Sequence, residues 1–342
     1  YMNFSLRSET MNIGVILNRV FRVNNNPLFE YISQQQEDID KCYLIIPQEL
    51  FEEDGTELKE RYYYGTLDKF LKELHKHDIE PFLIDYSQLG DFSKDKGISE
   101  VVVAGDIMSY HQEAYDIRHL KKAFEKYDVT VTTLRANHYF KPSSTMNKQG
   151  EPYKVFTSFY KAHRSKLRHH SSYDYKLKDI AKIAVKSQQT LDKEVAQEGL
   201  SESQAIKNWN EYLENDIQKY DTNREYLPEV LTSQLSIVLA YGLIDINQII
   251  AQLLESYEED ESNIEKFIRE LMFREFYYVL MTQYPNTAHE AFNEKYRQIK
   301  WSNDNKNFQH WCEEQTGFPL VDAAMAELNN TGFMHNRMTV SY

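Results

Sequence analysis

The sequence of 342 residues is 41% hydrophobic and 27% charged, a composition that predicts about two globular domains and excludes collagen-like and largely disordered chains. The net charge of -14, from 39 basic and 53 acidic side chains, argues against a protein that coats nucleic acid indiscriminately. There are only two cysteines, no secretory leader, and no apolar run near the roughly 20 residues of a membrane helix, so we expect a cytoplasmic protein.

The first part of the chain alternates strand and helix patterns. Residues 1–10 are polar and aperiodic, and we expect them to be an extension. Beyond them, β-branched runs predict strands at Asn12–Leu17, Cys42–Ile46, Pro81–Asp85, Glu100–Ala104 and Val129–Leu134. Helical patterns lie between the strands at Pro27–Gln36, Thr66–Lys76 and His111–Tyr127. This alternation predicts an α/β domain with a doubly wound parallel sheet over residues 11–137.

Local signals refine this α/β domain. Asn26 before Pro27 is typical of a helix start, because Asn caps unpaired N–H groups and Pro is tolerated at the first helical position. The glycines of the region lack the G-x-G spacing of a dinucleotide-binding turn and the spacing of a phosphate-binding loop. The common nucleotide-binding interpretations of this fold therefore lose support.

The strand signal fades after about residue 140. A Pro/Ser/Gly stretch, Pro142–Pro152, is followed by the basic run Lys161–His170, and we interpret residues 138–200 as a segment that crosses between domains. Ser201 with Gln204, and Ser262 with Glu265, have the spacing of helix-capping boxes. Residues 201–342 are therefore expected to be all-helical.

A loop rich in hydroxyl side chains precedes the apolar helix pattern Ile237–Gly242. Thr232, Ser233 and Ser236 lie in this loop. Hydroxyls and backbone N–H groups at a helix start suit an anion such as phosphate, but the same residues also serve as plain helix caps. The residues alone leave both interpretations open.

The helix pattern that begins near Ser262 has one polar and aromatic face. Glu270, Phe273, Arg274 and Tyr277 are spaced to lie on that face, and the opposite side is apolar. The face is either a solvated Glu–Arg pair worth about 0.2 to 0.5 kcal/mol or one wall of a cavity that binds a base or a cofactor. No set of His, Cys and carboxylates has metal-ligand spacing, so no metal site is expected.

The stretch from Trp311 to Arg337, WCEEQTGFPLVDAAMAELNNTGFMHNR, closely resembles the signature of the DNA photolyase/cryptochrome flavoprotein family. Further matches occur in family order. They are Phe21-Arg22 with Asn26-Pro27-Leu28, the segment Gly150–Phe159, the run Thr232–Ser236, and Phe273–Tyr277. The resemblance extends from Met11 to the end of the sequence and is strongest to class I cyclobutane pyrimidine dimer photolyases.

The resemblance implies an α/β antenna-chromophore domain at residues 11–137, a crossover at 138–200 and an all-α FAD-binding domain at 201–342. It also implies a light-driven lyase in which excited, reduced FAD gives an electron to a cyclobutane pyrimidine dimer, the ring splits, and the electron returns. The partner would be ultraviolet-damaged DNA, with the dimer flipped out of the duplex. We expect a monomer with no membrane partner.

The resemblance also implies roles for individual residues at the positions that match the family pattern. Tyr220, Arg274 and the run Thr232, Ser233, Gln234, Leu235 and Ser236 resemble flavin contacts, although Gln234 stands where Arg is common. Glu270 resembles the carboxylate that hydrogen-bonds the dimer. Arg224, Tyr277, Asn336 and Arg337 resemble positions next to DNA or the lesion, and Phe273 and Phe333 stand where tryptophans usually flank the dimer. Trp301 resembles the outer member of the tryptophan chain that reduces the flavin.

Two further expectations concern substrate and antenna. Asn336 stands where the branch that repairs 6-4 photoproducts typically has His, so cyclobutane dimers are favoured. The resemblance also implies a second chromophore in the first domain, of the folate or deazaflavin type, with contacts expected around Asp106–Arg118. The basic run near Lys161 would add a local patch that attracts phosphate.

The end of the sequence departs from the family pattern. The family continues well beyond Met-His-Asn-Arg, whereas here Arg337 is followed by only five residues, and we expect a truncated FAD-binding domain that holds part of the flavin site. Two alternatives to dimer repair stay open. One is a cryptochrome-like blue-light photoreceptor, which the phenylalanines Phe273 and Phe333 favour; the other is an inactive truncated fragment of a photolyase.

Overall fold

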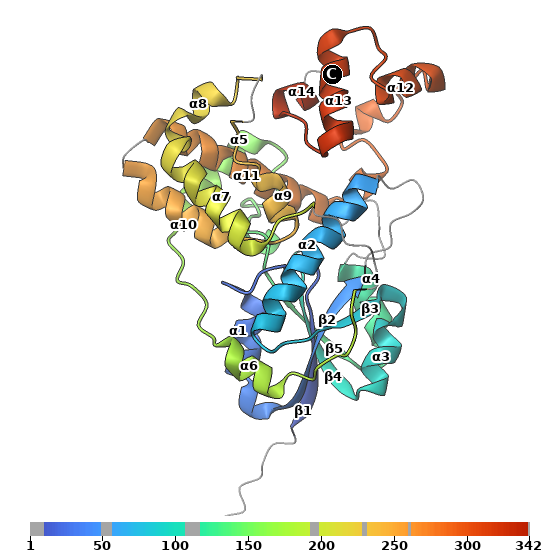
Figure 1. Cartoon of the computed structure of the whole chain (residues 1–342). Coiled ribbons are helices and arrows are strands. Elements are labelled where there is room, and N and C mark those ends of the chain that lie inside the picture. Colours follow the sequence, from blue (N-terminus) through green and yellow to red (C-terminus); the bar gives the residue numbers. More distant parts are fainter. Residues whose placement is uncertain are drawn as a thin grey trace, which may run out of the picture.

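A computed structural model gives the fold of the chain and describes residues 10–48, 57–106, 117–191, 198–227, 231–258 and 261–340 (Figure 1). The expected extension at residues 1–10 lies almost entirely outside these residues. Within them, the N-terminal part is a sheet flanked by helices, and the part beyond residue 198 contains helices and loops. In the part of the chain described, no helix is long and apolar enough to span a membrane.

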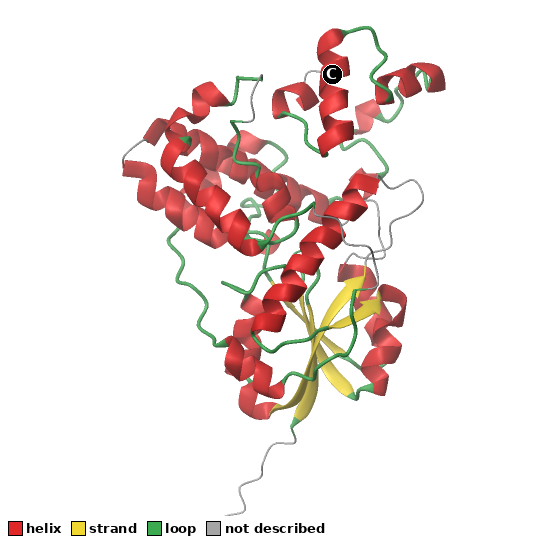
Figure 2. Ribbon diagram, in the orientation of Figure 1, coloured by secondary structure: helices red, strands yellow, loops and turns green. Residues whose placement is uncertain are grey.

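The sheet has five parallel strands in the order β3-β2-β1-β4-β5. Figure 2 shows the strands in yellow, flanked by red helices. The strands are β1 (Met11–Ile16), β2 (Ile39–Gln48), β3 (Phe82–Asp85), β4 (Ile98–Ala104) and β5 (Thr130–Leu134). All four neighbouring pairs are parallel. The predicted α/β fold and all five predicted strands are confirmed, with ends that differ by a few residues.

Both faces of the sheet are buried, and alternate residues divide between them. Val15, Leu44 and Val102 point to one face, which packs against α1 (Pro27–Gln34) and α2 (Glu57–Lys76). Their neighbours Ile16, Ile45 and Val103 point to the other face, covered by α3 (Leu89–Asp95) and α4 (Ile117–Glu125). Burial on both faces explains why these strands read as continuous β-branched runs rather than as alternating patterns.

The structure corrects the predicted helices of this region in two respects and leaves the start of a third helix untested. The helix predicted at Thr66–Lys76 is α2, which begins at Glu57, because Gly65 lies inside the helix and does not end it. The helix α3 was not predicted, since it spans only seven residues and includes Gly90. The helix predicted from His111 is described only from Ile117, and residues 107–116 lie outside the described chain. The Asn26 cap is confirmed, with its side chain accepting from Leu28 N–H.

Beyond residue 200 the described residues form helices joined by loops, which confirms the predicted all-helical region. After α5 (Phe156–His163) and α6 (Leu177–Ile183), the helices are α7 (Glu202–Asn215), α8 (Tyr220–Asn223), α9 (Leu235–Ala240), α10 (Ile246–Glu255), α11 (Glu261–Gln283), α12 (Asn305–Cys312), α13 (Pro319–Thr331) and α14 (Asn336–Val340). Ser201 caps α7 by accepting from Gln204 N–H, as predicted. The predicted cap at Ser262 is wrong, because Glu261 already belongs to α11.

Buried polar groups join the two regions. The Arg22 side chain is 1% exposed, and its guanidinium donates to the carbonyl oxygens of Ala136 and Gly242. From α7, Glu202 accepts from the backbone N–H groups of Val23 and Asn24. Gly242 has φ +63°, and a β-carbon there would lie 2.3 Å from the Arg19 carbonyl oxygen, so only glycine fits. The sheet and the helices α7–α11 therefore share a continuous, tightly joined core.

Candidate functional site

A cavity of about 380 Å³ lies in the helical region, between α8, α9, α11 and the segment around α14. Its walls come from parts of the chain more than 100 residues apart. The lining residues are Tyr220, Arg224, Thr232, Ser233, Gln234, Leu235, Ser236, Leu239, Phe267, Glu270, Leu271, Arg274, Phe333, Met334, His335, Asn336, Arg337 and Thr339. All seven predicted flavin contacts are therefore brought together with Arg224, Glu270, Phe333, Asn336 and Arg337.

The hydroxyl-rich loop forms one wall of this cavity. Gln234, at the cap position of α9, has a left-handed backbone with φ 51° and ψ 23°, a conformation that costs a non-glycine residue about 1 kcal/mol. Ser233 Oγ accepts from Leu235 N–H at 3.4 Å. The Thr232 hydroxyl is buried, and the described residues offer it no hydrogen-bond partner. A buried hydroxyl without a partner is costly, so this wall fits a polar ligand better than an empty space.

Four charged side chains form a chain of ion pairs at the cavity, and three of them, Arg224, Glu270 and Arg337, line it. Arg224 Nη1 lies 3.3 Å from Glu270 Oε1, and Arg224 Nε lies 3.6 Å from Glu225 Oε1. Arg337 Nη2 pairs with the same oxygen of Glu225. The hydrogen bond from Arg337 lowers the pKa of the Glu225 carboxyl, so it stays ionised at neutral pH. Glu270 thus pairs with Arg224 from another helix, which favours the cavity-wall interpretation over a simple Glu270–Arg274 pair.

Arg274 connects this cavity with the junction between the two regions. Its Nη1 lies 3.1 Å from His138 Nδ1 and 3.1 Å from Glu275 Oε1. Glu275 is fully buried and accepts from the N–H groups of Tyr139 and Phe140. Burial alone would raise the pKa of Glu275, but His138, Arg274 and the Phe140 N–H together hold it below its usual value. A charged carboxylate therefore holds the Arg274 side chain at the cavity.

Sequence reasoning missed three residues of this arrangement: His138, Glu275 and His335. Glu275 follows Arg274 directly, and its place on the apolar side of the α11 pattern was the signal that could have revealed it. His335 is 5% exposed, and its Nδ1 accepts from Arg337 N–H at 3.2 Å. Its Nε2 is buried with no hydrogen-bond partner among the described residues, like the Thr232 hydroxyl.

Three predicted residues are not among those that line this cavity. Phe273 stacks on Phe156, with ring centroids 3.4 Å apart and an interplanar angle of 11°. Tyr277 is 56% exposed and lines a separate cavity. Trp301 is 73% exposed. Their expected roles in binding the lesion and in electron transfer stay predictions.

The cavity that Tyr277 lines has about 290 Å³ and lies at the carboxyl ends of β1 and β4. Arg19 follows β1, and Asp106 follows β4. The Asp106 carboxylate accepts from the N–H groups of Ala136, Asn137 and His138, which fixes the loop after β5. Most of the segment Asp106–Arg118, where contacts of a second chromophore were expected, lies outside the described residues.

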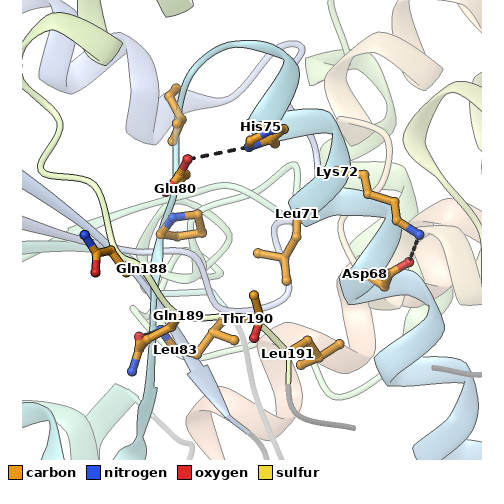
Figure 3. Close-up of a pocket in the computed structure, with 12 residues that line it drawn as sticks. Asp68, Leu71, Lys72, His75, Glu80, Leu83, Gln188, Gln189, Thr190 and Leu191 are labelled. Carbon is orange, nitrogen blue, oxygen red and sulfur yellow. Dashed lines mark hydrogen bonds and ion pairs between the residues drawn. The ribbon is translucent and has the colours of Figure 1, made fainter. Parts of the chain in front are cut away.

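A further cavity of about 470 Å³ lies on the α/β region, between α2, the start of β3 and residues 188–191. Figure 3 shows its charged residues paired with each other. His75 Nδ1 lies 3.6 Å from Glu80 Oε1, and Lys72 Nζ lies 2.6 Å from Asp68 Oδ2. Leu71, Leu83 and Leu191 supply an apolar floor. The cavity shares no residue with the two described above.

Comparison with known proteins gives two family matches. Residues 17–177 match the family described as DNA photolyase. Residues 267–342 match the FAD binding domain of DNA photolyase. The second match includes most of α11 and the whole of the α12–α14 segment, and so a large part of the cavity wall.

Several curated relatives are named deoxyribodipyrimidine photo-lyase. That of Alkalihalophilus pseudofirmus is 29% identical over 62% of this chain and 47% of its own length. That of Vibrio cholerae is 39% identical over 37% of this chain and 28% of its own length. That of Escherichia coli is 31% identical over 58% of this chain and 44% of its own length. The chain thus matches less than half the length of each of these relatives.

Solved structures share the fold. A class III photolyase from Agrobacterium tumefaciens has a TM-score of 0.79 at 22% identity, covering 99% of this chain and 73% of that chain. A Synechocystis cryptochrome has a TM-score of 0.76 at 17% identity, covering 97% of this chain and 74% of that chain. Both a photolyase and a cryptochrome therefore have this arrangement of sheet and helices.

Proposed function

Since the chain belongs to the DNA photolyase/cryptochrome family, we propose that it binds FAD in the cavity between α8, α9, α11 and α14 and functions in light-driven repair of cyclobutane pyrimidine dimers in DNA. The observation that carries this proposal is the composition of that one cavity. It places a hydroxyl-rich loop, the carboxylate of Glu270, the amide of Asn336 and the guanidinium groups of Arg224 and Arg337 around a single space.

The residues present fit a flavin dinucleotide. The Thr232 hydroxyl is buried and has no hydrogen-bond partner among the residues that the structure describes, and Ser233 and Ser236 lie in the same loop, so the loop offers hydroxyl groups to a diphosphate or a ribityl chain. Arg274 adds a cation, held in place by Glu275. When bound in its reduced form, the cofactor would supply the electron that opens the cyclobutane ring.

The chain's own residues would bind and orient the lesion. Arg224 and Arg337 are exposed enough, at 23% and 42%, to reach the phosphates on either side of a flipped dimer. The Glu270 carboxylate and the Asn336 amide lie in the same cavity and would hydrogen-bond the base edges. Phe333 supplies an aromatic wall.

The second candidate function is that of a cryptochrome-like photoreceptor, which binds the flavin without repairing DNA. The stacking of Phe273 on Phe156 favours it, because one face of this ring packs inside the protein rather than toward a lesion. The two functions differ in one measurable property. A repair enzyme prefers DNA that contains a dimer, whereas a photoreceptor binds the flavin and shows no such preference.

For the second chromophore, we propose the cavity at the carboxyl ends of β1 and β4. These strands are neighbours in the sheet, and their connections leave in opposite directions, so this is the switch point where ligands of doubly wound sheets usually bind. The occupant would be a folate or a deazaflavin. Extraction of pigments from the purified protein, followed by mass spectrometry, would test this assignment.

The proposed function can be tested in two steps. First, FAD is titrated into the purified protein, and binding is followed by quenching of flavin fluorescence. Second, the loaded protein is illuminated with an oligonucleotide that contains one thymine dimer. We expect Glu270→Gln to slow dimer splitting about tenfold or more, and Glu261→Gln, on the same helix α11 but outside the cavity, to leave it unchanged. Flavin binding without any preference for dimer DNA would contradict the repair function and favour the photoreceptor.

A further inference from the structure

One acidic side chain contacts both of the arginines that the proposed function assigns to DNA. Glu225 follows α8, and its Oε1 faces Arg224 Nε at 3.6 Å and also pairs with Arg337 Nη2. Arg337 lies 112 residues further along the chain, in α14. We propose that Glu225 determines specificity by occupying Arg224 and Arg337 in the free protein, so that undamaged DNA must displace it before its phosphates can bind. This inference rests on the proposed function.

The chemistry of these contacts resembles that of a phosphate. A carboxylate and a phosphate oxygen both accept charge-assisted hydrogen bonds from guanidinium groups, and arginine binds both in the same planar manner. The pKa of Glu225 is lowered, mainly by its hydrogen bond with Arg337, and that of Arg337 is raised by the same contact. Both partners are therefore charged at neutral pH, and the arginines already hold an anion.

The position of Glu225 allows this anion to be replaced. The side chain is 53% exposed, and that of Arg337 is 42% exposed. Ion pairs this accessible to water are weak, because the solvent screens them. A phosphate can therefore take the place of the carboxylate, but only by giving up part of its binding energy to break the existing pairs.

This competition weakens undamaged DNA more than damaged DNA. Undamaged duplex offers the site only its phosphates, so displacing Glu225 removes a larger share of its binding energy than it does for damaged DNA. A flipped dimer adds contacts with Glu270 and Asn336 inside the cavity, and these two side chains are not among the partners of Glu225 in the described structure. The internal anion thus increases the ratio of affinities for damaged and undamaged DNA.

The test compares Glu225→Gln with wild type and with Asp221→Asn. Asp221 lies in α8 and pairs with Lys266, so its substitution removes the same charge from the same segment without touching either arginine. Binding of a 20-base-pair duplex, undamaged or with one thymine dimer, is measured by fluorescence anisotropy over a series of salt concentrations. Thermal melting of each variant establishes that it is folded, and Glu225→Asp, which keeps the charge, should behave nearly as wild type does.

We expect Glu225→Gln to tighten binding of undamaged DNA about threefold to tenfold and to steepen the salt dependence by about one phosphate contact. Affinity for dimer DNA should rise less, so the ratio falls. An equal gain of affinity in Asp221→Asn would overturn the inference, because the change in net charge alone would then explain the tighter binding. The inference would also be overturned if Glu225→Gln gained no affinity for undamaged DNA. If Glu225→Gln gains affinity for undamaged DNA while no protein prefers dimer DNA, the proposed repair function and the effect of Glu225 on specificity are both contradicted, and only the competition between Glu225 and phosphate stands.

Discussion

The sheet region and the C-terminal helices α12–α14 differ in how much of their apolar side chains is exposed to solvent. In the sheet, Ile13, Val15 and Val102 are fully buried. Among the C-terminal helices and the segment before them, Trp301 is 73% exposed and Phe318 is 69% exposed. The first region is stabilised by its own burial, whereas the second is fixed by fewer contacts, such as the Arg337–Glu225 pair. The candidate cavity is lined by residues of α8, α9 and α11 and by residues 333–339, which include part of α14, so a ligand there would contact both groups of helices.

The largest expected difference concerns two tryptophans. Trp209 of α7 is 1% exposed and donates from Nε1 to Gln252 Oε1 at 2.9 Å, whereas Trp301 is largely exposed. Trp209→Ala should lower the free energy of unfolding by about 3 to 5 kcal/mol, because it opens a cavity in the core. Trp301→Ala should change it by less than about 0.5 kcal/mol. Equilibrium unfolding in urea measures both values.

A matched variant makes this comparison sharper. Trp209→Phe keeps most of the ring volume and loses only the indole hydrogen bond, so it should cost much less than Trp209→Ala. If Trp301→Ala destabilised the protein as much as Trp209→Ala does, the C-terminal helices would have a core that their exposure does not reveal, and the contrast between the two regions would fail.

The next largest change in stability is expected for Glu275, the buried carboxylate between the sheet region and the helical region. Glu275→Gln should lower the free energy of unfolding at pH 7 by about 1.5 to 3 kcal/mol, because a charged acceptor of several hydrogen bonds is lost. The folded pKa of Glu275 lies below the ordinary 4.5, so its contribution is present above that pH and is lost as pH falls through the folded pKa. The difference between wild type and variant should therefore narrow in acid.

Glu202→Gln is the control for this pH dependence. Burial raises the pKa of Glu202 above 4.5, so protonation favours the folded protein, and the difference between wild type and this variant should widen in acid. Denaturant unfolding at pH 7 and at about pH 4 would reveal the two trends. Parallel trends for the two variants would contradict the opposite pKa directions.

The smallest expected change in stability comes from replacing glutamine by glycine at two positions. Gln234, in the cavity loop, has φ 51°, so Gln234→Gly removes strain and should stabilise the protein by about 0.5 kcal/mol. Gln309 lies inside α12, and Gln309→Gly should destabilise it by about 1 kcal/mol, because glycine is a poor helix former. Thermal unfolding measures both changes, and a loss of stability in Gln234→Gly would mean that the loop needs the glutamine side chain.

The sequence predicted the sheet well and the limits of the helices less well. Runs such as Glu100–Ala104 are β-branched and sit between turn residues, so their strands follow from local chemistry. The start of α2 at Glu57 could not be predicted in this way, because Gly65 interrupts the helical pattern. Ser262 has the spacing of a cap, yet Glu261 before it already belongs to α11, so the spacing of a capping box alone did not locate the start of this helix.

For the candidate site, the sequence predicted most of the residues that line the cavity but not the side chains that contact them. Most of the predicted residues between Tyr220 and Arg337 line one cavity, whereas Phe273, Tyr277 and Trp301 do not. Glu225 and its partner Arg337 are separated by 112 positions in the sequence, and Glu275 and its backbone partner Tyr139 by 136. No local pattern encodes such distant contacts, so the partners of these two acids became visible only in the folded structure.

The crossover segment after α6 has a consequence for how the chain folds during synthesis. Val185 N–H donates to the Cys42 carbonyl, Ser187 N–H to the Glu80 carbonyl, and Gln189 Oε1 accepts from Leu83 N–H. The edge of the sheet at β3 is thus completed by residues made about 100 positions after the strand itself. At ribosomal rates this takes roughly 5 to 20 s, during which the nascent edge stays open to pairing with other chains and is a target for chaperones.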